Sequence, residues 1–160
     1  MKGLKDKVVI VTGGAGGIGS ATCRRLAEEG AKVAIFDMNI EAAEKLAKEI
    51  NHQKGQALAV QCDITQSDMV EQAVQQVETA LGPIDGLVNN AGWDIFKPFV
   101  KSNPQEWDKL IQINLVGMLN MHFAVLKGMV ERNSGSIVNI ASDAARVGSS
   151  GEAVYAACKG

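Results

Sequence analysis

The feature that most constrains the fold of this chain is a glycine-rich run near its N-terminus. Val8–Val11 has the pattern of a buried strand, a helical pattern starts at Ile18, and between them Thr12–Gly19 carries five glycines within seven residues. Glycine allows backbone angles and close approaches that a Cβ atom would block, and the helix that follows presents free N–H groups to an anion. Such a loop indicates a dinucleotide-binding site rather than a turn that only lets strand and helix pack closely.

The run fits two glycine spacings, Gly14-x-Gly16-x-x-Gly19 and Gly13-x-x-x-Gly17-x-Gly19. Both place the loop backbone against a pyrophosphate at the helix N-terminus. The residues that we expect to contact the cofactor here are Gly13, Gly14, Gly16, Gly17, Ile18 and Gly19.

Apolar, β-branched runs alternate with helical patterns along the whole chain. Strands are expected at 8–11, 32–36, 57–62, 84–88 and 136–140, and helices at 18–29, 41–51, 67–81 and from 103 to about 130. Short apolar strands separated by helices predict a doubly wound parallel sheet covered on both faces, an α/β fold. Because there is no repeat and no low-complexity linker, we predict one domain over residues 1–160.

Composition argues against several functions. Hydrophobic residues make up 46% of the 160 residues, enough for a core, and the net charge of -2 argues against a nucleic-acid or membrane partner. No apolar run approaches the roughly 20 residues of a membrane span, and the N-terminus lacks a signal-peptide layout. Cys23, Cys62 and Cys158 are scattered and odd in number, which favours reduced thiols in the cytoplasm. His52 and His122 lie far from these cysteines, so no metal site is expected.

Asp37 is expected to select the cofactor. It ends the second strand, 18 residues after Gly19, near the usual place of the acidic residue that binds the adenosine ribose. A carboxylate there accepts hydrogen bonds from a diol and repels a 2′-phosphate. Because no Lys or Arg follows within several residues, the sequence favours NAD over NADP. Asp37 could instead cap the next helix, but Asn39 is available for that role.

The other end of the chain carries a pair suited to proton transfer. Tyr155 and Lys159 are four residues apart and would share one face of a helix. A nearby ammonium stabilises the phenolate and lowers the pKa of a tyrosine. Such pairs are common on helix surfaces, so the pair gains meaning only together with the glycine run.

In combination these motifs resemble the short-chain dehydrogenase/reductase family, in its compact form. The matching residues occur in the order of the family: Thr12–Gly19, Asp63, Asn89–Gly92 (NNAG), Asn114, Ser142 and Tyr155-x-x-x-Lys159. The resemblance covers the whole chain, and the combination is far more specific than any single motif. It implies a Rossmann-type sheet with strand order 3-2-1-4-5 and the fifth strand at an edge.

The resemblance also implies a role for each matching residue. Tyr155 would be the general acid/base that takes the alcohol proton as hydride moves to NAD, and Lys159 would lower its pKa and hold the nicotinamide ribose. Ser142 would hydrogen-bond the substrate oxygen, and Asn114 would hold a water in a proton relay. Besides the glycine run, the implied cofactor-binding residues are Asp37, Asp63, Ile64, Asn90, Ala91, Gly92, Tyr155 and Lys159.

Two of these residues have ordinary alternatives. Ser142 is expected to end the fifth strand, so that its side chain emerges at the carboxyl edge of the sheet. A turn serine is the alternative, although Ser149 and Ser150 suit a turn better. Asn114 lies mid-helix between apolar neighbours and could simply face solvent.

A finer resemblance concerns the substrate. The stretches Asn89–Phe99 and Asn139–Gly160 are most similar to a member that acts on an alicyclic hydroxyacyl-CoA in aromatic-compound degradation. This resemblance implies oxidation of a secondary ring alcohol to a β-keto thioester. Lys97, Lys101 or Arg146 could then meet the CoA phosphates, or be solvated charges.

Family members continue beyond the Tyr-x-x-x-Lys helix with elements that cover the substrate. We therefore expect the 160 residues to be a truncated form that is inactive alone, and the full-length protein to be a homotetramer. Three alternatives remain: a 3-oxoacyl carrier or CoA reductase of the same family, an epimerase or dehydratase of the extended branch, and a catalytically silent dinucleotide-binding module. Asp37 counts against the first, because that role usually goes with NADPH, and Asn89–Gly92 counts against the second.

Overall fold

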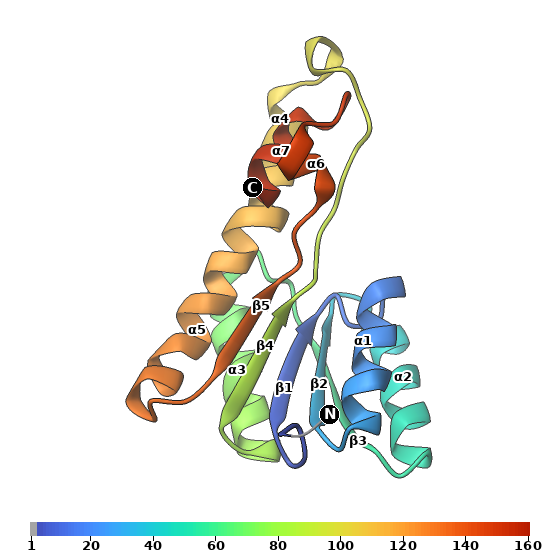
Figure 1. Cartoon of the computed structure of the whole chain (residues 1–160), viewed down its shortest axis with the longest axis vertical. Helices are drawn as coiled ribbons and strands as arrows, with labels where there is room; N and C mark the ends of the chain where they lie inside the picture. Colours follow the sequence, from blue (N-terminus) through green and yellow to red (C-terminus); the bar gives the residue numbers. More distant parts are fainter. Residues whose placement is uncertain (1–2) are drawn as a thin grey trace.

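The computed structural model of the protein describes residues 3–160 and centres on a five-stranded sheet (Figure 1). The strand order is β3-β2-β1-β4-β5 and all four pairings are parallel, which confirms the predicted α/β fold. The strands are β1 Val8–Thr12, β2 Lys32–Asp37, β3 Gln56–Gln61, β4 Ile84–Asn89 and β5 Ser136–Asn139. The helices are α1 Gly17–Glu28, α2 Ile40–His52, α3 Ser67–Leu81, α4 Pro104–Ile111, α5 Gly117–Glu131, α6 Asp143–Val147 and α7 Ala153–Lys159, with a 3₁₀ turn η1 Phe99–Lys101 and a π-helical segment η2 Gln112–Val116.

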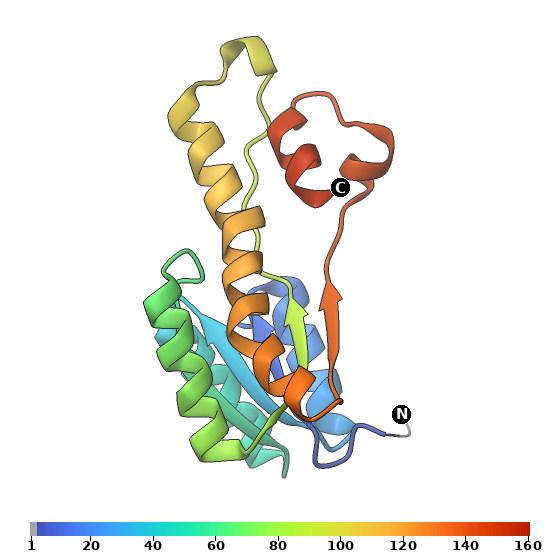
Figure 2. The same cartoon turned by 90° about the vertical axis from the view of Figure 1, so that its left-hand side faces the viewer.

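Helices cover both faces of the sheet, which explains why β1 is apolar at successive positions. Val9 and Val11 pack on the face covered by α1 and α2, whereas Val8 and Ile10 pack on the face covered by α3 and α5. All five residues of β1 are buried. The two helical layers lie on opposite sides of the sheet in Figure 2, so each strand side chain finds an apolar neighbour whichever way it points.

Short local signals set the ends of the helices. Asn39 caps α2 by accepting a hydrogen bond from Ala42 N at 3.1 Å, as predicted. Gly82 follows α3 with φ of 107°, a left-handed conformation that favours glycine and ends the helix. Asn103 and Glu106 form a reciprocal capping box at the start of α4.

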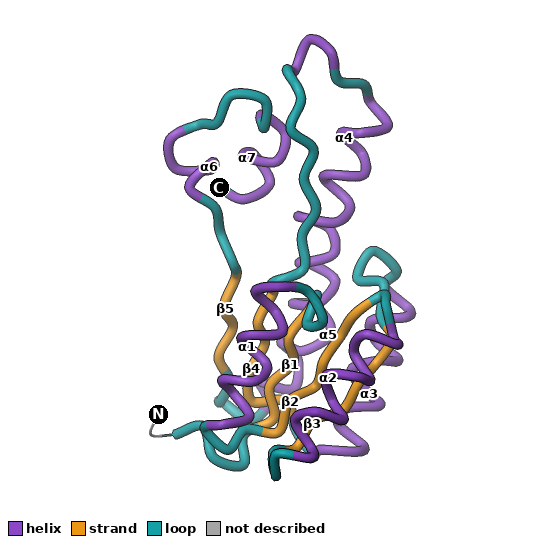
Figure 3. The backbone as a smooth tube through the Cα atoms, turned by 90° about the vertical axis from the view of Figure 1, so that its right-hand side faces the viewer, coloured by secondary structure: helices purple, strands orange, loops and turns teal. Residues whose placement is uncertain are grey.

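The stretch from Pro104 to Glu131 is nearly one continuous helix, and it extends well beyond the sheet (Figure 3). By length and composition it could cross a membrane, contrary to the sequence-based expectation. A single such helix is weak evidence, because the core helix of a soluble protein passes the same test. Here Met121, Val125 and Met129 pack α5 against the sheet.

The fifth strand lies at the edge of the sheet, as predicted, and only Ile137 of its four residues is partly buried. Beyond it the chain forms α6 and α7, which lie past the carboxyl edge of the sheet beside α4 (Figure 2). The short helix α6 was not anticipated from the sequence. The β5–α7 segment therefore shares little of the sheet's packed core.

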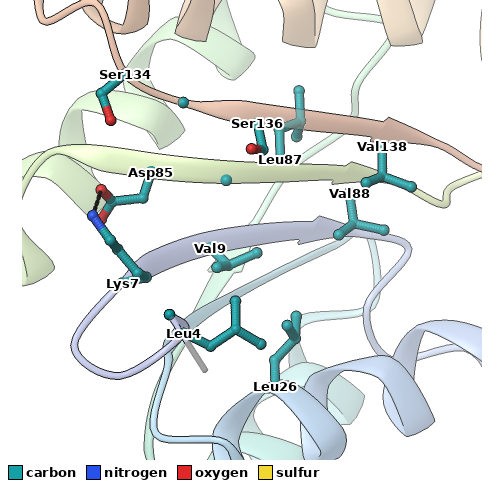
Figure 4. A pocket seen from close by; sticks show the side chains of 13 residues that line it. Leu4, Lys7, Val9, Leu26, Asp85, Leu87, Val88, Ser134, Ser136 and Val138 are labelled. Carbon is teal, nitrogen blue, oxygen red and sulfur yellow. Dashed lines mark hydrogen bonds and ion pairs between the residues drawn. The ribbon is translucent and has the colours of Figure 1, made fainter. Parts of the chain in front are cut away.

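A hollow runs along β1, β4 and β5 on the sheet face that carries α1 (Figure 4). It has a volume of about 480 Å³ and is bordered by Leu26, Val88 and Val138, among others. Lys7 and Asp85 form an ion pair of 2.8 Å at its rim. Its walls carry none of the residues expected to bind the cofactor or to catalyse the reaction.

Candidate active site

The largest cavity among the described residues opens at the carboxyl edge of the sheet. This carboxyl-edge cleft has a volume of about 730 Å³ and collects residues from loops that follow four different strands. Open α/β sheets bind ligands at this edge. Its walls include Gly13, Gly16, Gly17, Ile18, Gly19, Asp37, Asp63, Ile64, Asn90, Ala91 and Gly92.

The glycine loop is shaped by close approaches that exclude side chains. Gly13 has φ of 59°, and a Cβ atom there would lie 2.9 Å from Ala91 Cα. A Cβ atom on Gly19 would lie 2.1 Å from Gly13 O and 2.8 Å from Asn90 Nδ2. Gly14, which does not border the cleft, is equally tight, because its Cβ would lie 2.9 Å from Val11 O. These glycines are required by packing, whatever the loop binds.

Asn90 fastens the loop to the end of β4. Its Nδ2 donates hydrogen bonds to Thr12 O at 2.9 Å and to Gly13 O at 3.1 Å. In return Thr12 Oγ1 accepts hydrogen bonds from Asn90 N and Ala91 N, both at 3.0 Å. This exchange fixes the loop relative to β4 and gives Asn90 and Ala91 a clear structural task at the wall of the cleft.

Asp37 ties the second strand to the same loop. Its Oδ2 accepts a hydrogen bond from Ala15 N at 3.0 Å, and its Oδ1 accepts one from Asn39 N at 3.0 Å. The carboxylate is only partly buried and borders the cleft. Each carboxylate oxygen has a further lone pair, so Asp37 keeps acceptor capacity for a diol.

Asp63 and Ile64 lie at the far wall of the cleft, after β3. Asp63 Oδ1 accepts hydrogen bonds from Thr65 N at 3.0 Å and Thr65 Oγ1 at 2.8 Å, a local turn that orients the carboxylate. Ile64 is 8% exposed and packs so closely on Gly117 that a Cβ atom there would lie 2.6 Å from its Cδ1. Ile64 therefore belongs to the core as well as to the cleft.

Asn114 is buried, which excludes the alternative that it faces solvent. It lies in the π-helical segment η2, where its Nδ2 donates to Trp93 O at 2.7 Å and to Leu110 O at 3.0 Å. Its Oδ1 accepts a hydrogen bond from Trp93 N at 3.2 Å. The side chain thus holds the loop after β4 from both sides. A π segment inside an α-helix often marks a functional site, and the sequence did not reveal it.

Lys159 reaches the same neighbourhood from α7. A Cβ atom on Gly92 would lie 3.4 Å from Lys159 Nζ and 3.0 Å from Asn114 Oδ1, so these three residues converge. Lys159 Nζ donates to Ile140 O at 3.0 Å, and burial lowers the pKa of this lysine. The ammonium also lies 5.9 Å from the centroid of the Tyr155 ring, as expected for two residues four apart on one helix.

Tyr155 borders a separate, small hollow rather than the carboxyl-edge cleft. That hollow also contains Asp94 and Glu152. Burial and a hydrogen bond with Glu152 raise the pKa of Asp94, whereas hydrogen bonds from Ser149 and Asp94 lower the pKa of Glu152. The structure therefore brings Lys159, Asn114 and Gly92 together, and it places Tyr155 beside Lys159 but not among the residues that line the carboxyl-edge cleft.

The expectation that Ser142 ends the fifth strand is wrong. Strand β5 ends at Asn139, and Ser142 is the N-cap of α6, where its Oγ accepts a hydrogen bond from Ala144 N at 3.2 Å. It borders an open hollow together with Lys159 and Arg146. Ser142 therefore has the turn role that was the alternative to a place at the end of the strand. Its hydroxyl hydrogen is not used in that bond and could still be donated to a substrate oxygen.

Six residues that border the carboxyl-edge cleft were not predicted as cofactor contacts: Met38, Cys62, Thr65, Trp93, Lys109 and Ile113. Trp93 directly follows the NNAG motif, and Lys109 lies one helical turn before Ile113, which also borders the cleft. Helical spacing from Asn114 would not have pointed to Lys109, because the two residues are five apart. In the described part of the chain, no group of three or more His, Cys, Asp or Glu side chains could hold a metal ion.

Comparisons with known proteins place this architecture among oxidoreductases. A model of the short chain dehydrogenase family matches residues 7–160. D-threitol dehydrogenase of Mycolicibacterium smegmatis is 40% identical over 156 residues, which is 98% of this chain and 60% of the relative. Cyclopentanol dehydrogenase of Comamonas testosteroni is 39% identical over 157 residues, 98% of this chain and 63% of the relative. The chain thus spans less than two thirds of the length of these relatives.

Solved structures agree with this match. The crystal structure of NAD+-bound xylitol dehydrogenase has a TM-score of 0.94 and 38% sequence identity, over 99% of this chain and 61% of that one. A metagenomic short-chain oxidoreductase in complex with NADP has a TM-score of 0.92 and 35% identity, over 98% of this chain and 71% of that one. Similar folds therefore bind either nicotinamide dinucleotide.

Proposed function

Because the chain belongs to the short-chain dehydrogenase family, we propose that it oxidises a secondary alcohol to a ketone with NAD as the hydride acceptor. The single observation that carries this proposal is the carboxyl-edge cleft, where the glycine loop, Asp37 and Asp63 face one volume of about 730 Å³. The proposal concerns the full-length protein. The relatives that this chain matches are longer than its 160 residues.

The loop fits a dinucleotide. Helix α1 begins after Gly16, which offers no side chain to cap the helix, so the first N–H groups of α1 remain available to an anion. Glycines at positions 13 and 19 keep the loop too tight for any Cβ atom. Bound NAD would supply the hydride acceptor, while the chain's own residues would position the alcohol and manage its proton.

NAD is favoured over NADP by Asp37. Its carboxylate borders the cleft where β2 ends and would repel a 2′-phosphate. The first Lys or Arg after it is Lys45, more than one turn into α2. We expect a kcat/KM for NAD well above that for NADP, and a loss of this preference in Asp37→Ala. A wild-type preference for NADP would refute the assignment.

Tyr155 is proposed as the general acid/base of the reaction. The Lys159 ammonium lies 5.9 Å from the centroid of its ring, and the cost of burying that ammonium is reduced when a phenolate forms beside it. Ser142 would donate its free hydroxyl hydrogen to the reacting oxygen. Asn114 would hold the loop of Trp93 and a relay water beside Lys159.

The substrate proposed is an alicyclic hydroxyacyl-CoA of the 2-hydroxycyclohexanecarboxyl-CoA type. This finer step rests on the resemblance of Asn89–Phe99 and Asn139–Gly160, and the relative that acts on cyclopentanol supports an alicyclic ring. Of the cations considered for the CoA phosphates, Lys97 is already paired with Glu106 at 2.7 Å. Lys101 and Arg146 remain exposed, Arg146 with only a loose pair to Asp143.

Two other properties belong to the same proposal. We expect a homotetramer, because α5 exposes a row of apolar side chains that includes Leu119, Phe123 and Val130. We expect the protein in the cytoplasm, where its three free thiols stay reduced. Sedimentation of the full-length protein would test the first, and cell fractionation would test the second.

The main alternative is a 3-oxoacyl reductase, since a carrier-protein reductase of Thermotoga maritima is 36% identical over 156 residues. A second is a catalytically silent dinucleotide-binding module. A panel of hydroxyacyl-CoAs, cyclic alcohols, polyols and 3-oxoacyl thioesters, assayed with NAD(H) and NADP(H), separates these. Turnover of alicyclic hydroxyacyl-CoA with NAD supports the proposal. Turnover of simple alcohols alone would overturn the CoA thioester, and dinucleotide binding without turnover of any substrate would favour the silent module.

A further inference from the structure

We propose that Lys109, held against the indole of Trp93, is a cofactor-binding residue that contacts the pyrophosphate of the dinucleotide from the wall of the carboxyl-edge cleft opposite the glycine loop. The inference rests on the proposed function, because it takes a dinucleotide to be the occupant of that cleft. Neither residue belongs to the glycine loop, to the NNAG motif or to the proposed catalytic group.

The geometry of the pair places a cation in the cleft. Lys109 Nζ lies 4.1 Å from the centroid of the Trp93 ring, within the range of a cation–π interaction. Both residues border the cleft, together with Ile113 one helical turn further along. The glycine loop lies where β1 meets α1, whereas Lys109 projects from α4, so the two approach the cleft from opposite layers of the fold.

The indole is a fixed platform. Trp93 N donates to Asn114 Oδ1 at 3.2 Å, and Trp93 O accepts from Asn114 Nδ2 at 2.7 Å. Asn114 itself is buried and also donates to Leu110 O. Because both backbone polar groups of Trp93 are held in this way, its ring restricts the long and otherwise mobile side chain of Lys109. A preorganised lysine loses less conformational entropy when it binds an anion.

The charge balance of the cleft requires such a cation. Its walls carry the carboxylates of Asp37 and Asp63, and Lys109 is the only Lys or Arg among its lining residues. A pyrophosphate brings two negative charges, which the N-terminus of α1 balances only in part, since a helix end acts as about half a unit charge. Lys109 supplies the missing positive charge at short range.

Other nearby lysines are already engaged. Lys97 is paired with Glu106 at 2.7 Å, and Lys159 donates to Ile140 O at 3.0 Å. Among the ion pairs of the described residues, none involves Lys109. Its ammonium therefore has hydrogen-bond donors left for a phosphate oxygen, and neither Lys97 nor Lys159 lines this cleft.

The test measures binding of three ligands to the full chain by calorimetry: NAD, ADP-ribose and adenosine. Lys109→Met should lower the affinity for NAD and for ADP-ribose about fivefold, the upper range for an exposed charge pair. It should leave adenosine unchanged, because adenosine has no pyrophosphate. Lys109→Arg should restore most of the affinity. The matched control is Lys48→Met, which removes the same charge from an exposed position on α2.

Trp93→Leu removes the platform but keeps the charge, so it should weaken NAD less than Lys109→Met does. A higher salt concentration should reduce NAD affinity more in the wild type than in Lys109→Met. Equal NAD affinity in the wild type and Lys109→Met overturns the inference and leaves the proposed function standing. So does a raised KM for an acyl-CoA with unchanged NAD affinity, since the lysine would then serve the CoA pyrophosphate. A wild type that binds neither NAD nor ADP-ribose overturns the proposed function and the inference with it.

Discussion

The region proposed to bind the cofactor and the region proposed to transfer the proton are held in place in very different ways. The cofactor half, which comprises β1 to β4 with α1 to α3, is built on a packed core in which all five residues of β1 are buried. The catalytic segment, residues 136–160, has one buried residue, Ala144, and α7 has none. The cofactor half is therefore held in place by close packing, whereas the catalytic segment is held mainly by a few hydrogen bonds.

Those hydrogen bonds can be named. Asn89 connects the two regions, because its Nδ2 donates to Asn139 Oδ1 at 2.9 Å and its carbonyl accepts from Ile140 N at 2.9 Å. Lys97 N donates to Gly151 O at 2.8 Å just before α7. Each such bond contributes about 1 kcal/mol, far less than a shared core. We expect changes in the cofactor half to affect folding and binding together, and changes in the catalytic segment to affect turnover more than folding.

The sharpest test of that separation is Tyr155→Phe in the full-length enzyme. Loss of the hydroxyl should lower kcat by about 10²–10⁴, the usual range for an acid/base group. NAD affinity and the melting temperature should stay close to wild type, because Tyr155 borders neither the carboxyl-edge cleft nor the core. Steady-state kinetics and NAD titration check both parts. Activity within a few-fold of wild type would remove Tyr155 from the mechanism.

The cysteines provide a probe of each region. Burial raises the pKa of Cys23 and Cys62 to about 12, so only about one thiol in 10⁴ would be ionised at pH 8, and the thiolate is the reactive form. Cys158 lies in α7 and is only partly buried. With a colorimetric thiol reagent, one group should react at least about 100-fold faster than the other two. Cys158→Ser should abolish the fast phase, and Cys23→Ser should not.

The opposite result is equally clear to observe. Two or three fast thiols in the native protein would mean that the core of the cofactor half opens as readily as the catalytic segment. That outcome would contradict the comparison itself, whatever the enzyme's substrate.

A substitution in the glycine loop tests the packed half. Gly19→Ala places a Cβ atom 2.1 Å from Gly13 O, so the loop must shift. We expect a loss of about 1–3 kcal/mol in the free energy of unfolding, together with weaker NAD binding. Gly17→Ala is the matched control, since nothing lies within 4 Å of its Cβ, and stability should not fall there. Chemical denaturation measures both. Similar stabilities would mean that the loop is looser than its contacts indicate.

Sequence patterns predicted the cofactor half well because its determinants are local or periodic. Local signals gave Asn39 as the available cap and the end of α3 before Gly82, and the structure has both. The strand order, which the family resemblance implied, is also confirmed. Capping a helix is not the main role of Asp37, because its Oδ2 accepts a hydrogen bond from Ala15 N, 22 positions earlier in the sequence. Residues in such segments face the same environment in every fold of this kind.

The parts of the site outside the cofactor half were predicted less well because their structure depends on contacts between distant residues. The π segment forms where Asn114 bonds the loop of Trp93, and periodicity alone cannot signal that contact. Ser142 lies three residues beyond the strand it was expected to end, because the chain turns early into α6. The pairing of Lys97 with Glu106 likewise joins a loop to a helix and removes a candidate CoA contact. The roles of these residues stay predictions.

The smallest expected effect concerns the carboxyl pair that ties the loop after β4 to α7. The pKa of Asp94 is raised, mainly by burial and then by its hydrogen bond with Glu152. Its contribution to stability is therefore complete below its ordinary pKa and is lost as pH rises through the raised value. The pKa of Glu152 is lowered by hydrogen bonds from Ser149 and Asp94, so its contribution is present above its ordinary pKa and is lost as pH falls. Between the two values the proton lies on Asp94.

Asp94→Asn should flatten this pH dependence, because an amide donates a hydrogen bond to Glu152 at every pH. Between pH 4 and pH 8, the melting temperature of the variant should rise relative to that of the wild type as the pH rises. The gain should be smaller than the loss caused by Gly19→Ala, since both carboxyls are partly exposed and water screens them. Asp108→Asn, at an exposed position on α4, is the control and should run parallel to the wild type. If Asp94→Asn also runs parallel, the two carboxyls share no proton, and this pair does not help to hold the catalytic segment.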